Sequence, residues 1–187
     1  MKIMKSVLKF FLIIGLTLVV APTVSAQKIP KPSIAVMDVQ GILRESAAAK
    51  SIRPQARKMR TKFQKDVRRQ QDELRKAEQT LAQQRSILSS EAFAKKRRDF
   101  ESRARQTQKD VQTRKQALEK AFGGAMEEVR RALIIVAQDL AKKHKINIVL
   151  PKSVVFLSLT NLDLSKQALI MLDKKLPSVK VVVKEKK

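Results

Sequence analysis

Acidic side chains that could do chemistry are present in this chain, but their spacing does not build a catalytic set. They stand next to one another at Asp72-Glu73 and Glu127-Glu128. Neighbours on a helix point about 100° apart, so neither pair can act as a carboxylate dyad. His144 is the single histidine and has no second histidine or cysteine to work with, so we interpret it as a helix-end residue.

The remaining sequence motifs also argue against catalysis. The chain has no cysteine, which excludes a disulfide, a thiolate metal site and a cysteine nucleophile. It has no glycine-rich phosphate loop, no HExxH, no CxxC and no serine in a nucleophile-elbow context. We therefore predict a protein without catalytic residues, without a cofactor and without a metal.

Positive charge is the dominant feature of the composition. The 187 residues carry a net charge of +24, and residues 51–122 alone contain 21 lysines and arginines against 9 acids. Such an excess predicts an acidic partner or an anionic lipid surface, with an affinity that falls as salt rises. The residues that we expect to form this electrostatic surface are Lys95, Lys96, Arg97, Arg98, Arg68 and Arg69.

The N-terminus has the pattern of a signal peptide over residues 1–26. Lys2, Lys5 and Lys9 precede an apolar run from Phe10 to Val20, and Val24-Ser25-Ala26 fits a cleavage site between Ala26 and Gln27. The apolar run is about half the roughly 20 residues that a membrane-spanning helix needs. We expect export with cleavage; an uncleaved signal anchor is the alternative.

A helical periodicity organises residues 51–124. Apolar positions recur at steps of three and four, a spacing typical of a coiled coil. Folding the chain back near Leu88–Ser89, where Ser89 or Ser90 can cap a helix, places apolar positions opposite one another. This predicts an antiparallel coiled-coil hairpin, hereafter the arm, with its tip near residues 86–91. We expect Ser51 to cap its first helix, with Pro54 in the first turn.

Gly123-Gly124 is predicted to interrupt the second helix of the arm. In the fold-back register Gly123 falls opposite Pro54, so both weak points lie where the arm leaves the rest of the protein. We consider two readings, a hinge formed by Gly123, Gly124 and Pro54, and a packing requirement for close approach of the helices.

The segments on either side of the arm, residues 27–50 and 125–187, predict a small β-rich body. We expect strands at 34–37, 146–150 and 154–159, a helix from Val39 to about Ala49 capped by Asp38, and a closing helix capped by Asp163 or Ser165 that runs through Leu176. The fold class is thus α+β, mainly α, with the arm inserted in the body. Open strand edges predict oligomerisation. The expected body and oligomer core is Ile34, Val36, Ile146, Ile148, Leu150 and Val155.

The order of these elements resembles the Skp (OmpH) family of periplasmic chaperones. The resemblance rests on Ile-Ala-Val-Met-Asp-Val-Gln-Gly-Ile-Leu, the long basic hairpin, Ile-Asn-Ile-Val-Leu, Val-Val-Phe and Asp-Leu-Ser-Lys-Gln-Ala-Leu, and it covers about Ser33 to Leu176. It implies a "jellyfish" homotrimer whose arms enclose a cavity. It also implies an ATP-independent holdase for unfolded outer-membrane proteins in the periplasm, and an association with lipopolysaccharide.

Apolar residues near the tip are the expected client-binding positions: Phe93, Ile87, Leu88 and Phe100. Each could instead belong to the hairpin seam. Two other functions fit parts of the sequence. A structural envelope spacer would use the coiled coil alone, and a nucleic-acid-binding coiled coil would use the charge alone. The export signal and the missing recognition fold argue against specific nucleic-acid binding.

Overall fold

The structure, a computed structural model, describes residues 30–184, so the predicted signal peptide lies outside the described residues. The chain divides into two units, Met1–Lys31 and Pro32–Lys187. The second unit is mainly helical. Its elements are β1 (Ile34–Met37), α1 (Val39–Glu45), α2 (Ala47–Gln84), α3 (Ser90–His144), β2 (Ile148–Pro151), two short 3-10 turns (Lys152–Val154 and Thr160–Leu162) and α4 (Ser165–Lys175).

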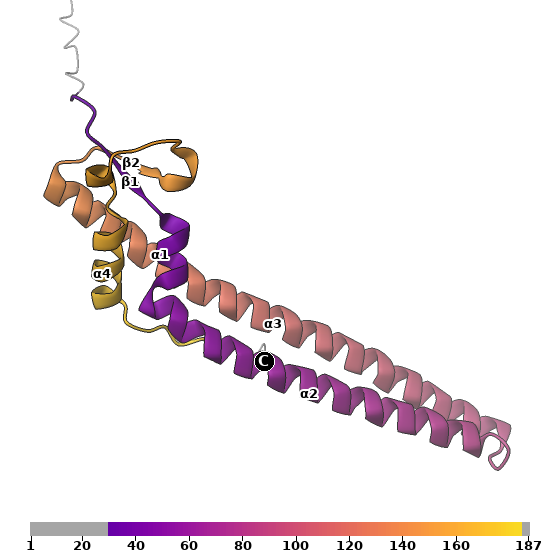
Figure 1. Ribbon diagram of the computed structural model, residues 1–187. Helices are drawn as coiled ribbons and strands as arrows, with labels where there is room; N and C mark the ends of the chain where they lie inside the picture. The colour runs from indigo at the N-terminus through magenta and orange to yellow at the C-terminus, as the bar shows by residue number, and fades with distance from the viewer. Residues whose placement is uncertain (1–29, 185–187) are drawn as a thin grey trace, which may run out of the picture. The chain divides into compact units, whose positions relative to one another are not determined.

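Two long helices dominate this unit. The chain reverses direction between α2 and α3, which lie side by side away from the strands (Figure 1). Ser89, one of the two residues predicted as a cap, caps α3, because its side chain accepts a hydrogen bond from the Ala92 amide at 3.3 Å. An ion pair of 3.2 Å between Arg103 and Glu73 joins the two helices.

The hydrophobic core lies at the other end of the helix pair. Its centre is one buried stripe on α3, formed by Ala125, Val129, Leu133, Val136 and Leu140. These residues recur every three or four positions, the spacing of one face of a helix. β1, α1, the start of α2 and α4 all contribute residues to the same cluster.

The sheet has two strands, not the three that we predicted. β1 and β2 are parallel, with Ile34 opposite Ile148 and Met37 opposite Pro151. The predicted strand at 154–159 is wrong, since this segment forms no strand in the described chain. The segment is apolar at every position except Ser158, but it does not pair with β1 or β2, and Phe156, Leu157 and Leu159 are 105%, 84% and 70% exposed.

The boundary between the first two helices also differs from the prediction. α1 ends at Glu45, and Ser46, which is fully buried, caps α2 by accepting from the Ala49 amide. Ser51 therefore lies inside α2, and Pro54 lies beyond its first turn. The helix begins early because Ala48 and Ala49 are strong helix formers that are buried in the core.

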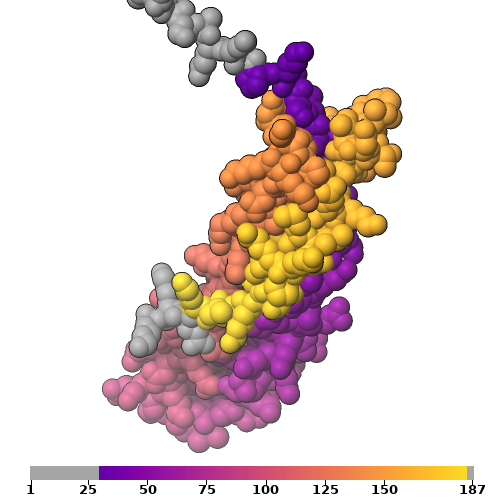
Figure 2. Space-filling model, turned by 90° about the vertical axis from the view of Figure 1, so that its left-hand side faces the viewer, coloured from indigo at the N-terminus to yellow at the C-terminus, as the bar shows by residue number. Residues whose placement is uncertain are grey.

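The residues after α4 form an extended tail, residues 177–184, that lies along α2. Val179 and Val181 are 4% and 3% exposed and belong to the core cluster. Figure 2 shows this tail, in yellow, crossing one face of the molecule from α4 toward the helix pair. The sequence left the structure of this segment open.

Asp163 connects three parts of the body. Its carboxylate accepts hydrogen bonds from the Ser165 amide, the Ser165 hydroxyl and, at 2.9 Å, the Lys152 ammonium. The Ser165 hydroxyl in turn accepts a hydrogen bond from the Asp38 amide at 2.8 Å, next to the end of β1. The bonds from Ser165 and Lys152 lower the pKa of Asp163 to about 2.

This pKa predicts a loss of stability in acid. A carboxyl group whose pKa is lowered on folding stabilises the protein above its unfolded pKa, near 4, and that contribution disappears as the pH falls to about 2. Asp163→Asn should therefore lower the free energy of unfolding at neutral pH, and should flatten its decline between about pH 4 and about 2. Urea denaturation at several pH values measures this; parallel curves for the two proteins would contradict it.

Candidate functional site

The basic surface is placed on the solvent side of the arm helices. Lys95, Lys96, Arg97 and Arg98 are all exposed near the start of α3. Arg97 pairs with Glu101 at 3.6 Å, whereas the other three have no ion pair with any described residue. The positive charge near the tip is therefore largely uncompensated.

The second basic pair lies on α2 and is less uniform. Arg68 and Arg69 are both exposed. Arg69 pairs with Asp66 at 3.4 Å and with Glu73 at 4.0 Å, whereas Arg68 has no ion pair within residues 30–184. Exposed pairs of this kind contribute little to stability, so these side chains stay available to an anionic partner.

The apolar residues that we predicted to bind a client differ in exposure. Ile87 lies in the turn between α2 and α3 and is 80% exposed. Leu88, Phe93 and Phe100 are half-buried along the helix pair. The structure thus places one of the four fully in solvent and three where they both pack and face outward.

The predicted core residues divide in the same way. Val36 is 2% exposed and buried in the core. Ile146, Leu150 and Val155 are half-buried. Ile34 and Ile148, which face each other across the strand pair, are 41% and 40% exposed. They are therefore not core residues of the single chain, and their place in an oligomer stays a prediction.

The glycine pair does not interrupt α3, so that prediction is wrong. The helix is continuous through Gly123 and Gly124, both of which are exposed. A Cβ atom at either position would meet nothing within 4 Å, so packing within the described chain does not require glycine there. The alternative explanation, that the two glycines allow close approach of the helices, therefore has no support within the described chain.

Gly123→Ala combined with Gly124→Ala should stabilise the protein. Alanine is favoured over glycine by about 1 kcal/mol per position in an exposed helix, so the free energy of unfolding should rise by up to about 2 kcal/mol. Urea denaturation measures the change. The same variant tests the hinge: if NMR relaxation shows unchanged arm mobility and client capacity is unchanged, the hinge reading fails.

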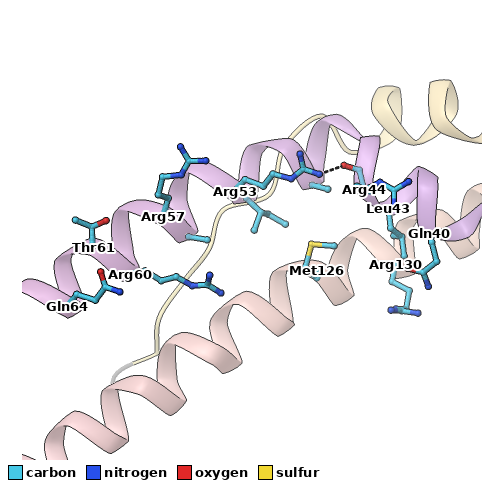
Figure 3. A pocket seen from close by; sticks show the side chains of 13 residues that line it. Gln40, Leu43, Arg44, Arg53, Arg57, Arg60, Thr61, Gln64, Met126 and Arg130 are labelled. Atoms are coloured by element: carbon cyan, nitrogen blue, oxygen red, sulfur yellow. Dashed lines mark hydrogen bonds between the residues drawn. The ribbon is translucent and has the colours of Figure 1, made fainter. Parts of the chain in front are cut away.

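A groove of about 790 Å³ lies at the root of the arm and was not predicted from the sequence (Figure 3). Apolar residues such as Ile52 and Met126 contribute to its wall, and no acidic residue lines it. Its basic lining residues are Arg44, Arg53, Arg57, Arg60 and Arg130. They come from α1, α2 and α3, so only the fold brings them together.

The guanidinium groups of this groove differ in how firmly they are held. Arg53 donates to the Arg44 carbonyl at 2.6 Å, and Arg60 lies 5.6 Å from the centre of the Phe122 ring, a cation–π distance. Arg57 points away from α3 in Figure 3 and has no ion pair with any described residue. The groove combines apolar walls with positive charge and suits an anionic ligand with an apolar part.

Other kinds of site are not found in the part of the chain that the structure describes. Residues 30–184 contain no group of three or more histidines, cysteines or acids that could hold a metal ion. None of the helices in that range is both long enough and apolar enough to cross a membrane. His144 lies in the last turn of α3, as expected, 3.1 Å from the Gln167 side chain.

Comparison with known proteins decides the family. A family model described as "Outer membrane protein (OmpH-like)" matches residues 33–172. The chain belongs to the OmpH-like family. The match runs from the start of the strand pair to the last turn of α4, so residues 177–184 of this OmpH-like chain lie outside it.

A solved structure has the same fold. It is that of a candidate outer membrane chaperone (OmpH-like) from Caulobacter crescentus CB15, with a TM-score of 0.74 and 14% sequence identity. The similarity covers 84% of this chain and 93% of that one. No curated protein matches the sequence.

Proposed function

We propose that this OmpH-like protein is an ATP-independent periplasmic holdase that binds unfolded outer-membrane proteins and prevents their aggregation. The observation that carries the proposal is the arm. Two long helices leave the core, and the segment 51–122 has a net charge of +12 with apolar side chains partly exposed along it. Membership of the OmpH-like family and the chaperone named in the similar structure support this role.

Binding energy alone has to hold a client where no ATP is available. Many weak contacts along a long surface add up to a useful affinity and still allow release. A protein that binds the unfolded state lowers its free concentration and so opposes aggregation. The uncompensated charge of Lys95, Lys96 and Arg98 would speed the encounter with acidic clients and with anionic lipid, including lipopolysaccharide.

The loop at 154–159 supports assembly into an oligomer, and we propose a homotrimer. Phe156, Leu157 and Leu159 are almost fully exposed and close together in sequence. Contiguous apolar exposure of this kind marks interaction surfaces. We assign this loop, together with the exposed Ile34 and Ile148, to the contact between subunits, which would leave the arms free to surround a client.

Replacing Phe156 and Leu157 by aspartate should therefore lower the oligomer mass. Light scattering of the chain from Gln27 onward should give three chains per particle, and the double variant should give fewer, because buried charge at the contact is costly. Ile87→Asp, an equally exposed apolar position at the arm tip, is the matched control and should keep the trimer mass. A double variant with unchanged mass would exclude this loop from the contact.

The holdase is tested by diluting a urea-denatured outer-membrane β-barrel protein into the chain. A particle whose mass increases by one client, with the client kept soluble, is the expected result in size-exclusion light scattering. Changing Lys95, Lys96 and Arg98 to glutamine should slow association several-fold at low salt, and the difference should vanish near about 1 M salt, where the Debye length is about 3 Å.

The matched control removes the same charge from exposed lysines outside the arm and the tail, Lys143, Lys166 and Lys174. It should leave the association rate close to that of the unchanged protein. A client that aggregates despite an excess of the protein would contradict the holdase, and the spacer function would then be favoured. Strong DNA binding without client binding would favour the nucleic-acid reading.

A further inference from the structure

The tail contacts α2 as one β-strand contacts another. The Val179 amide donates to the Ser51 hydroxyl at 3.0 Å, and the Gln55 side-chain amide donates to the Val179 carbonyl at 2.8 Å. The Val181 amide donates to the Gln55 side-chain oxygen at 3.0 Å. The N–H and C=O groups of Val179 and the N–H group of Val181 all face α2. A β-strand presents its backbone groups to a neighbouring strand in the same pattern.

Side chains of α2 thus take the place of a partner strand. Ser51 and Gln55 are four residues apart and lie on the same face of the helix. The tail's side chains alternate accordingly: Val179 and Val181 point into the core cluster, whereas Lys180 and Val182 are exposed. We call the surface of α2 that carries Ser51 and Gln55, with the core residues beneath it, the tail site.

The contacts of the tail site select an alternation of apolar and other residues and not one particular peptide sequence. Every hydrogen bond to the tail goes to backbone atoms, so any extended peptide could make them. The inward positions need small or medium apolar side chains at every second residue. The outward positions are open to solvent and accept any residue.

The tail is also held by few contacts. Two valines and the polar groups of Ser51 and Gln55 attach it, and Pro177, Ser178 and Lys180 are exposed. It lies beyond the residues that the family model matches. We expect a segment attached in this way to leave its site at a lower free-energy cost than α4 or the strand pair would.

We propose that the tail site is a binding site for extended peptides with apolar residues at alternate positions, and that the protein's own tail occupies it until such a peptide displaces it. Strands of outer-membrane barrels alternate apolar and polar residues in this way. The identification of unfolded clients as the natural ligand rests on the proposed function. The existence of the peptide site does not depend on that function.

The test uses a fluorescent peptide with the tail's own sequence, PSVKVVVK, and measures its binding by anisotropy. A chain that ends at Leu176 has an open site in every molecule, whereas the longer chain binds only in the fraction whose tail has left. The shortened chain should therefore bind the peptide at least about tenfold more tightly. If it fails to fold, Val179→Lys with Val181→Lys in the full-length chain releases the tail instead.

Two matched controls separate pattern from charge. The peptide PSVVKKVV has the same composition but has no two valines at alternate positions in any register, and it should bind at least about tenfold more weakly. Gln55→Ala in the shortened chain should weaken binding of PSVKVVVK. Gln71→Ala, at an exposed glutamine farther along α2, should not.

Equal affinity of the long and shortened chains, or equal binding of the two peptides, would overturn the proposal. A particle mass that rises with protein concentration, and no longer does so in the shortened chain, would also overturn it, because the tail would then be exchanged between copies of the chain.

An unfolded barrel protein should displace the labelled peptide. If the client stays soluble without displacing it, the client is not the ligand of this site and the holdase stands. Peptide binding without client protection would instead refute the holdase alone.

Discussion

The buried face of α3 between Ala125 and Leu140 is the contact on which the rest of the described structure depends. Strand β1, helices α1 and α4 and the tail all add residues to the cluster around it. The stripe joins segments that are more than 100 residues apart in sequence, such as β1 and α4, which both contribute residues to this cluster. Removing this face would leave every body element without a core.

The arm is stabilised in a different way. All residues from 53 to 124 are described, and none of them is fully buried. Helices that bury so little depend on their own hydrogen bonds, on partial burial along the pair and on weak surface ion pairs such as Arg103–Glu73. We expect such a region to open locally at a low free-energy cost, whereas the core stripe of α3 should open only with global unfolding. This division fits the proposed function, in which the body assembles and the arm adapts to unfolded clients.

Local chemistry made part of this structure predictable. The strand at 34–37, the Asp38 cap, the Ser89 cap and the end of α3 near Lys145 each follow from a few neighbouring residues. The long periodic segments likewise predicted long helices.

The wrong predictions of the strand at 154–159 and of the first turn of α2 share one cause, which is that each depended on residues distant in sequence. The segment 154–159 is apolar like a buried strand, but it does not pair with either strand of the described sheet. Pro54 was placed in a first turn because burial of Ala48 and Ala49 was not visible from the sequence. The arginine-lined groove and the tail site both combine residues from separate elements, so no local pattern could reveal them.

Hydrogen exchange with and without an unfolded barrel client tests the central claim most directly: the body provides stability and the arm provides binding. In the free protein, amides of α3 between Ala125 and Leu140 should exchange most slowly, and those near Ile87 most rapidly. Client binding should slow exchange along α2 and the first half of α3 and leave the α3 core stripe unchanged. Protection confined to the strand pair and α4, with the arm unaffected, would contradict the account.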